Sequence, residues 1–146
     1  QNQDISEAVR SEKTGTQASL IATLPSVRQA LLTRQRAFVA GTGLVADGRD
    51  MASVVFPQAA LKVFLTASVE IRAERRFKQL NQKRNNAILA DILQDLQARD
   101  TRDTQRAVAP LVQLPDAILL DTSALTIDAA VDFILQHVKQ RKISVF

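Results

Sequence analysis

Residues 47–50, Asp-Gly-Arg-Asp, form the stretch of this sequence best suited to binding a charged ligand. The apolar residues 44–46 precede them and predict a buried strand. Ligands of open α/β sheets bind just outside the carboxyl ends of strands, which is where this turn would lie. Arg49 offers a planar fork to phosphate or carboxylate, and Asp50 can accept hydrogen bonds from a polar ligand. The alternative is a surface turn whose charges pair with each other.

The charged run 99–106 is a second candidate site. Its residues Arg99, Asp103 and Arg106 recur at i, i+4 and i+7, which places them on one face of a helix. Arginines separated by a carboxylate retain donors for an anion. Many such runs are nevertheless solvated, ion-paired helix faces, so the spacing alone leaves both interpretations open.

Three further arginines, Arg72, Arg75 and Arg76, crowd another predicted helix. Like charges one turn apart repel by roughly a few tenths of a kcal/mol, so the helix gains nothing from them by itself. A polyphosphate ligand would turn this repulsion into attraction. Simple solubility is the competing explanation.

The composition limits the chemistry available to these groups. The 146 residues, 46% of them apolar, suffice for one domain with a buried core. The absence of cysteine and the single histidine exclude disulfides, thiolate metal sites and multi-histidine metal clusters. The net charge of +4 favours anionic partners, but six Phe without Trp or Tyr provide little for stacking nucleic-acid bases. We therefore do not expect nucleic acid as a partner. The sequence has no run of about 18 apolar residues and no leader pattern, so we expect no membrane partner and a cytoplasmic location.

Alternating strands and helices must position these groups. The pattern predicts strands at 44–46, 61–65 and 117–121, and two helices within 17–40 that are separated near Leu24. Further helices are predicted from Ser68, over 88–106 and over 126–141. This order predicts an α/β fold with a mostly parallel sheet flanked by helices.

Two motifs in this sequence are similar to those of a known family. Residues 44–51, Leu-Val-Ala-Asp-Gly-Arg-Asp-Met, with Val54-Val-Phe-Pro57, and the run Arg99 to Leu111 resemble the bacterial cytidylate kinases. Ser19 and the segments 25–28 and 31–36 match the same family. The resemblance extends from about Asp4 to Lys139.

This resemblance implies a P-loop nucleoside monophosphate kinase fold that transfers the γ-phosphate of ATP to CMP or dCMP with Mg²⁺. By position, it assigns the cytosine base to Ser19, Arg28 and Asp50, the acceptor phosphate to Arg49 and Arg106, and the sugar to Arg99 and Asp103. It places a mobile lid at about residues 70–86, whose arginines Arg72, Arg75 and Arg76 close over the ATP phosphates. Arg49, Arg76 and Arg106 are the residues it implies in the transfer itself.

The sequence also departs from the family pattern. Ala52 stands where the family has glycine, and the family's first strand, its phosphate loop and most of its CMP-binding insertion have no counterpart here. We therefore expect an incomplete fragment, in which residues 1–15 are a remnant of the insertion and 16–146 are part of the core kinase domain. We expect such a fragment to be inactive alone and able to self-associate, and its parent to be monomeric. A basic nucleic-acid-binding module and a helical interaction domain are the rival interpretations, and both treat the spacing of the motifs as accidental.

Overall fold

A computed structural model describes residues 4–9, 11–41, 43–82 and 87–143. The chain begins with α1 (Ser6–Val9), α2 (Glu12–Ile21) and α3 (Pro25–Arg36), and continues through a single turn of π-helix, η1 (Met51–Val55). Strand β1 (Val63–Thr66) is followed by helices α4 (Val69–Gln82) and α5 (Leu89–Gln105). Strand β2 (Ile118–Asp121) and helix α6 (Ile127–Gln140) complete the order of elements.

The two strands form a parallel pair in which Val63 lies opposite Ile118 and Thr66 opposite Asp121. The predicted strands 61–65 and 117–121 are confirmed, each beginning one or two residues later than expected. Lys62 Nζ donates to Asp116 Oδ2 at 2.7 Å and joins the two segments of the chain just before the strands begin. Parallel strands need a long crossover connection, which α4 and α5 provide here.

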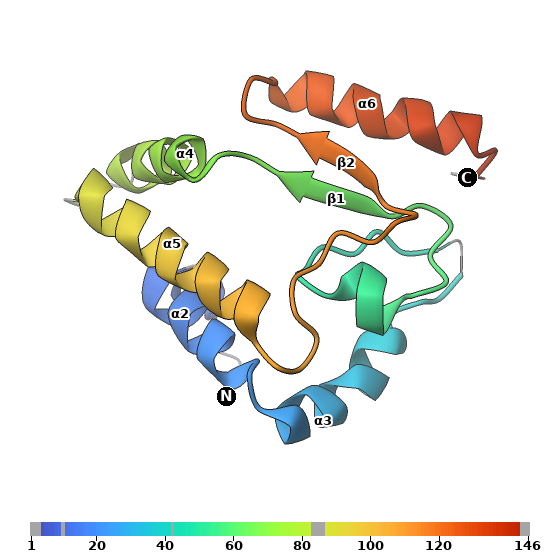
Figure 1. Cartoon of the computed structure of the whole chain (residues 1–146), viewed down its shortest axis with the longest axis horizontal. Coiled ribbons are helices and arrows are strands. Elements are labelled where there is room, and N and C mark those ends of the chain that lie inside the picture. Colours follow the sequence, from blue (N-terminus) through green and yellow to red (C-terminus); the bar gives the residue numbers. More distant parts are fainter. Residues whose placement is uncertain (1–3, 10, 42, 83–86, 144–146) are drawn as a thin grey trace.

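Helices α2, α4 and α5 pack together on one side of the strands, while α3 and η1 lie below the strands in Figure 1. The break near Leu24 is confirmed, with Pro25 in the first turn of α3. Helix α2 begins five residues before the predicted start at Gln17, because Ser11 Oγ caps it by accepting a hydrogen bond from Thr14 N at 3.2 Å. The expected boundary between the insertion remnant (1–15) and the core (16–146) thus falls inside helix α2.

The predicted strand at 44–46 is wrong. These residues do not form a strand, Leu44 is exposed, and Val45 is 100% exposed. A strand requires a neighbour to satisfy its backbone groups, and β1 and β2 pair only with each other among the described residues. Apolar character without a pairing partner therefore does not make this segment a strand.

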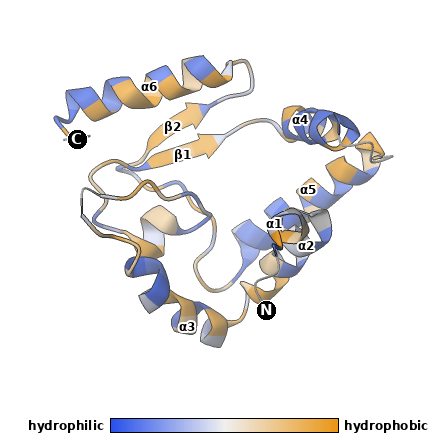
Figure 2. Cartoon of the chain, turned by 180° about the vertical axis from the view of Figure 1, so that it is seen from behind, coloured by the Kyte–Doolittle hydropathy of each residue, from blue (hydrophilic) through white to orange (hydrophobic). Residues whose placement is uncertain are grey.

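The buried apolar core is small. Among the described residues it comprises Val55, Ala67, Ala73, Ile92 and Leu120. Figure 2 shows apolar residues on both strands and in bands along α6, yet no residue of α6 is buried and Ile127 is 83% exposed. None of the described helices is long and apolar enough to cross a membrane.

Candidate active site

Asp103 lies at the centre of a polar cluster near the end of α5. Its side chain is almost completely buried, and its two oxygens have different partners. Ser19 Oγ, from α2, donates to Oδ1 at 3.0 Å, and Arg49 Nε donates to Oδ2 at 2.8 Å. Arg99, one turn earlier on α5, has its Nε 3.8 Å from the same Oδ2. The helical spacing of 99 and 103 thus brings both side chains to one place, as predicted.

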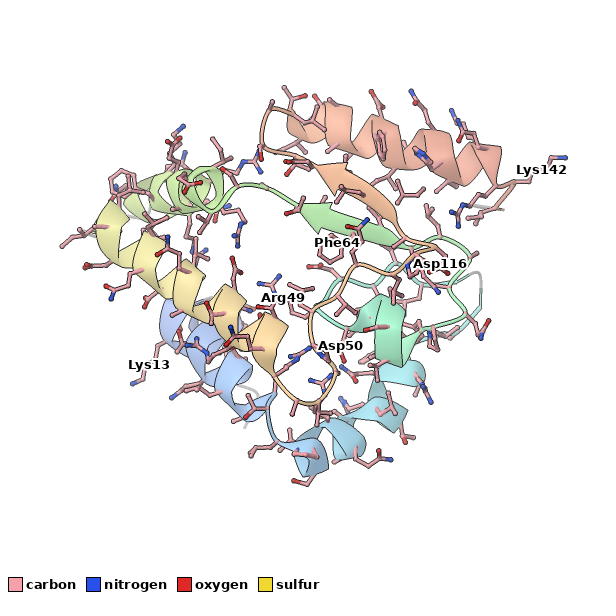
Figure 3. All side chains as sticks on the ribbon, in the orientation of Figure 1. Lys13, Arg49, Asp50, Phe64, Asp116 and Lys142 are labelled. Carbon is pink, nitrogen blue, oxygen red and sulfur yellow. The ribbon has the colours of Figure 1, made fainter. Side chains whose placement is uncertain are left out.

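Asp50 forms an ion pair with Arg28, which is located in the first half of α3. Both side chains are largely buried, and Arg28 Nη1 also donates to the carbonyl of Ala22 at 3.2 Å. Residues 47–49 are exposed, but the charges of the turn 47–50 do not pair with each other. Arg49 and Asp50 pair instead with α5 and α3, and Figure 3 shows them between α5 and η1.

Gly48 precedes these two residues and lies against Met51. A Cβ at position 48 would be 3.0 Å from Met51 Cγ, which is closer than real Cβ contacts usually come. A larger residue at position 48 would therefore require the side chain of Met51 to move. Ala52, which stands where the family has glycine, lies within η1, and its φ angle is not positive.

Arg106 follows the last turn of α5 and is 9% exposed. Its Nε donates to the carbonyl of Ala109 at 2.5 Å, and Ala109 adopts a φ of 50°, a left-handed conformation that costs energy for alanine. Burial lowers the pKa of Arg106 from its ordinary value, and the nearby charge of Arg28 lowers it further. The guanidinium nevertheless remains charged at neutral pH.

The Nη2 of Arg106 is buried and has no hydrogen-bond partner. A buried unpaired donor is costly, so an anion that accepts this hydrogen bond would be strongly favoured. Within the described residues, Arg28, Arg49, Arg99 and Arg106 of the cluster face two carboxylates, Asp50 and Asp103. The cluster therefore holds two more positive than negative charges, which favours an anion such as a phosphate.

A second group of arginines lies on α4. Arg72 makes a bidentate pair with Asp100 of α5, at 3.1 and 2.5 Å, and its Nε donates to the carbonyl of Ala67 at 3.1 Å. Arg75 donates to the hydroxyl and carbonyl oxygens of Thr122, and Arg76 Nη1 to Gln79 Oε1 at 3.2 Å. The contacts of Arg72 and Arg75 attach α4 to α5 and to the loop after β2, whereas the contact of Arg76 lies within α4.

The arginines of α4 and one arginine of the Asp103 cluster, Arg99, line an open cavity of about 550 Å³. Arg72, Arg75 and Arg76 line it from α4, and Arg99 lines it from α5. Gly15 and Ala18 of α2 form part of the opposite wall. Residues far apart in sequence thus meet at one hollow in the surface.

Sequence reasoning missed Asp100, which holds Arg72, and gave no role to Arg36 within the motif 31–36. The sequence signal for Asp100 was that it directly follows Arg99. This places its side chain on the neighbouring face of the same helix. Of the predicted lid, 83–86 lie outside the described residues, and 70–82 belong to α4.

No group of three or more His, Asp or Glu side chains suited to a metal ion occurs in the described part of the chain. Arginines surround the cluster and would repel a cation placed there. The cluster around Asp103 is therefore suited to an anion and not to a bare metal cation.

Comparison with known proteins identifies the family of this chain. The cytidylate kinase family profile matches residues 1–140. The chain is 57% identical to a cytidylate kinase of Chromobacterium violaceum over 97% of its own length, and 51% identical to one of Azotobacter vinelandii over 99%. It is 59% identical to one of Paraburkholderia phymatum over 91% of its length. The chain spans about three-fifths of the length of these curated relatives, covering 64%, 63% and 58% of them.

These matches confirm the resemblance seen in the two charged motifs, and with it the P-loop nucleoside monophosphate kinase fold class. The parallel pair β1 and β2, flanked by helices, is consistent with part of such an α/β fold. The rival interpretations, a nucleic-acid-binding module and a helical interaction domain, receive no support from the matches. The chain belongs to the cytidylate kinase family.

Proposed function

We propose that the whole protein transfers the γ-phosphate of ATP to CMP or dCMP, and that the cluster around Asp103 binds the acceptor nucleotide. The observation that carries this proposal is the buried, unpartnered Nη2 of Arg106, within a cluster that holds two excess positive charges. Phosphoryl transfer depends on positioning and on neutralising charge, and arginines supply both. MgATP is the proposed phosphate donor.

In this proposal, different residues of the cluster bind different parts of the acceptor nucleotide. Arg49 and Arg106 bind its phosphate, and the sugar lies against Arg99 and Asp103. The cytosine base is recognised by Ser19, Arg28 and Asp50. The hydrogen bonds that join Ser19, Arg49 and Asp103 support this division, because they hold three of these groups in one place before any ligand binds.

The arginines of α4 form the proposed donor side. Arg72, Arg75 and Arg76 line the cavity that Arg99 also lines, so phosphates of ATP bound there would lie near the acceptor cluster. In this proposal residues 70–86 are a lid, residues 1–15 belong to the CMP-binding insertion, and the remainder belongs to the core. Closing a lid excludes water and limits wasteful hydrolysis of ATP. A cytoplasmic location and a monomeric parent stay predictions.

Calorimetric titration of the 146-residue chain with CMP, cytidine and GMP tests the acceptor site. CMP is expected to bind at least about tenfold more tightly than cytidine, because only CMP brings an anion to Arg49 and Arg106. GMP is expected to bind more weakly than CMP, because the site for the base suits cytosine. Equal binding of CMP and GMP, or tighter binding of a DNA oligonucleotide, would contradict the proposal.

A further inference from the structure

Arg36, in the last turn of α3, binds two consecutive backbone carbonyls of η1. Its Nε donates to the carbonyl of Val55 at 3.0 Å, and its Nη2 donates to the carbonyl of Val54 at 3.0 Å. Planar guanidinium groups present paired donors in this way, which a lysine cannot do. The contact joins two elements that are separated by 14 residues of chain.

These carbonyls lie at the C-terminal end of η1, where a helix leaves its last oxygens without partners. The amide groups of the same two residues, Val54 and Val55, donate to the carbonyl of Asp50 at 2.9 and 3.2 Å. A continuous set of hydrogen bonds therefore runs from Arg36 through η1 to the backbone of Asp50. Single π-helical turns are uncommon and often occur at functional sites.

Helix α3 thus contacts both ends of the segment from Asp50 to Val55. Arg28, near the start of the helix, pairs with the side chain of Asp50, and Arg36, at its last residue, binds the end of η1. The side chain and the backbone of Asp50 are then restrained together. Arg49, the preceding residue, is restrained by the same backbone on one side and by Asp103 on the other.

We infer that Arg36 is a positioning residue for the acceptor nucleotide, acting through η1 on Arg49 and Asp50. Without the two hydrogen bonds from Arg36, the carbonyls at the end of η1 bond to water instead. The backbone that orients Arg49 and Asp50 then shifts. A small shift is costly, since misplacement by about 1 Å can weaken a site by up to about a hundredfold. This inference rests on the proposed function, because it presumes that Arg49 and Asp50 bind CMP.

The test compares Arg36→Ala with Arg34→Ala in the full chain. Arg34 is an exposed arginine in the same helical turn and has no hydrogen bond or ion pair within the described residues. The Kd for CMP is measured by calorimetry well below the melting temperature of each variant, so that only folded protein is titrated. Arg36→Ala is expected to weaken CMP binding about tenfold, and Arg34→Ala by less than about twofold.

A double variant separates positioning from general destabilisation. If Arg36 acts through Asp50, the loss caused by Arg36→Ala shrinks when Asp50→Asn is already present, and the two effects are not additive. A purely structural role would lower the melting temperature while the folded protein kept its affinity for CMP. Additive effects would therefore overturn the inference, as would unchanged binding by Arg36→Ala.

Should Arg36→Ala not fold, Arg36→Lys makes the same comparison, because lysine keeps the charge and reaches one carbonyl at a time. Its Kd is expected to rise about threefold, and binding equal to that of the unaltered chain would overturn the inference. If the unaltered chain itself binds no CMP, the proposed function fails together with this inference. If it binds CMP and the Arg36 variants bind equally well, only the role of Arg36 fails.

Discussion

Arg49 and Asp103 stand 54 positions apart in the sequence and are joined by a 2.8 Å hydrogen bond from Nε to Oδ2. This contact attaches the turn 47–50 to helix α5. Because Asp103 also accepts from Ser19, a single buried carboxylate aligns groups from three separate segments. The cluster around Asp103 is therefore assembled before any ligand is present, which lowers the entropic cost of binding a ligand there.

Removing the charge of Asp103 should destabilise the fold. Asp103→Asn leaves Arg49 and Arg99 without their shared carboxylate, and the loss of a charged, buried hydrogen-bond acceptor should lower the free energy of unfolding by about 2 kcal/mol. Urea denaturation measures this change. Asp95→Asn, at an exposed position on the same helix, is the control and should change stability by less than about 0.5 kcal/mol. Equal midpoints for the two variants would contradict the central place of Asp103.

Arg106→Ala should remove a large part of the contribution of the phosphate to binding. In the unaltered chain CMP is expected to bind more tightly than cytidine, and in the variant this preference should become clearly smaller, because only Arg49 remains to bind the phosphate. Calorimetric titration of both ligands measures the difference. Lys139→Ala on α6, far along the chain from the cluster, should keep the preference for CMP. A variant that lacks Arg106 and still prefers CMP by the original factor would exclude this residue from phosphate binding.

Asp116 should give the protein a component of stability that disappears in acid. The hydrogen bond from Lys62 holds the pKa of Asp116 below its ordinary value of 3.8, and burial opposes this only in part. Because the folded pKa is the lower one, the stabilisation is present above pH 3.8 and is lost as the pH falls through the folded pKa. Carboxyl NMR titration should show the pKa of Asp116 rising in Lys62→Gln. An unchanged value would show that Lys62 is not the cause.

Arg72→Met should impair the use of ATP more than the use of CMP. In the whole protein the KM for ATP is expected to rise about tenfold while the KM for CMP stays within about twofold, because Arg72 lines the proposed donor side. Steady-state kinetics with each substrate varied in turn provides both values. Lys78→Met, at an exposed position of the same helix, is the matched control. A rise in KM for CMP alone would place Arg72 on the acceptor side.

Much of the local structure could be predicted because it depends on neighbours in sequence. The proline at 25 marks the start of α3, and the apolar runs before Thr66 and Asp121 become the paired strands. The same argument failed at 44–46, since an apolar run predicts burial or pairing without supplying the partner strand. The paired charges at 99 and 103 followed from helical spacing alone.

The sequence by itself determined the family, the two charged motifs and the kinds of groups available for binding an anion. It could not determine which charges meet, because each carboxylate has several arginines within reach of a flexible chain. Only the tertiary structure decided that Asp50 pairs with Arg28, Asp103 with Arg49 and Asp100 with Arg72. It also decided that Arg106 keeps a buried donor unpaired. The physical reason is that ion pairing depends on distance and burial in space, which packing between distant segments sets.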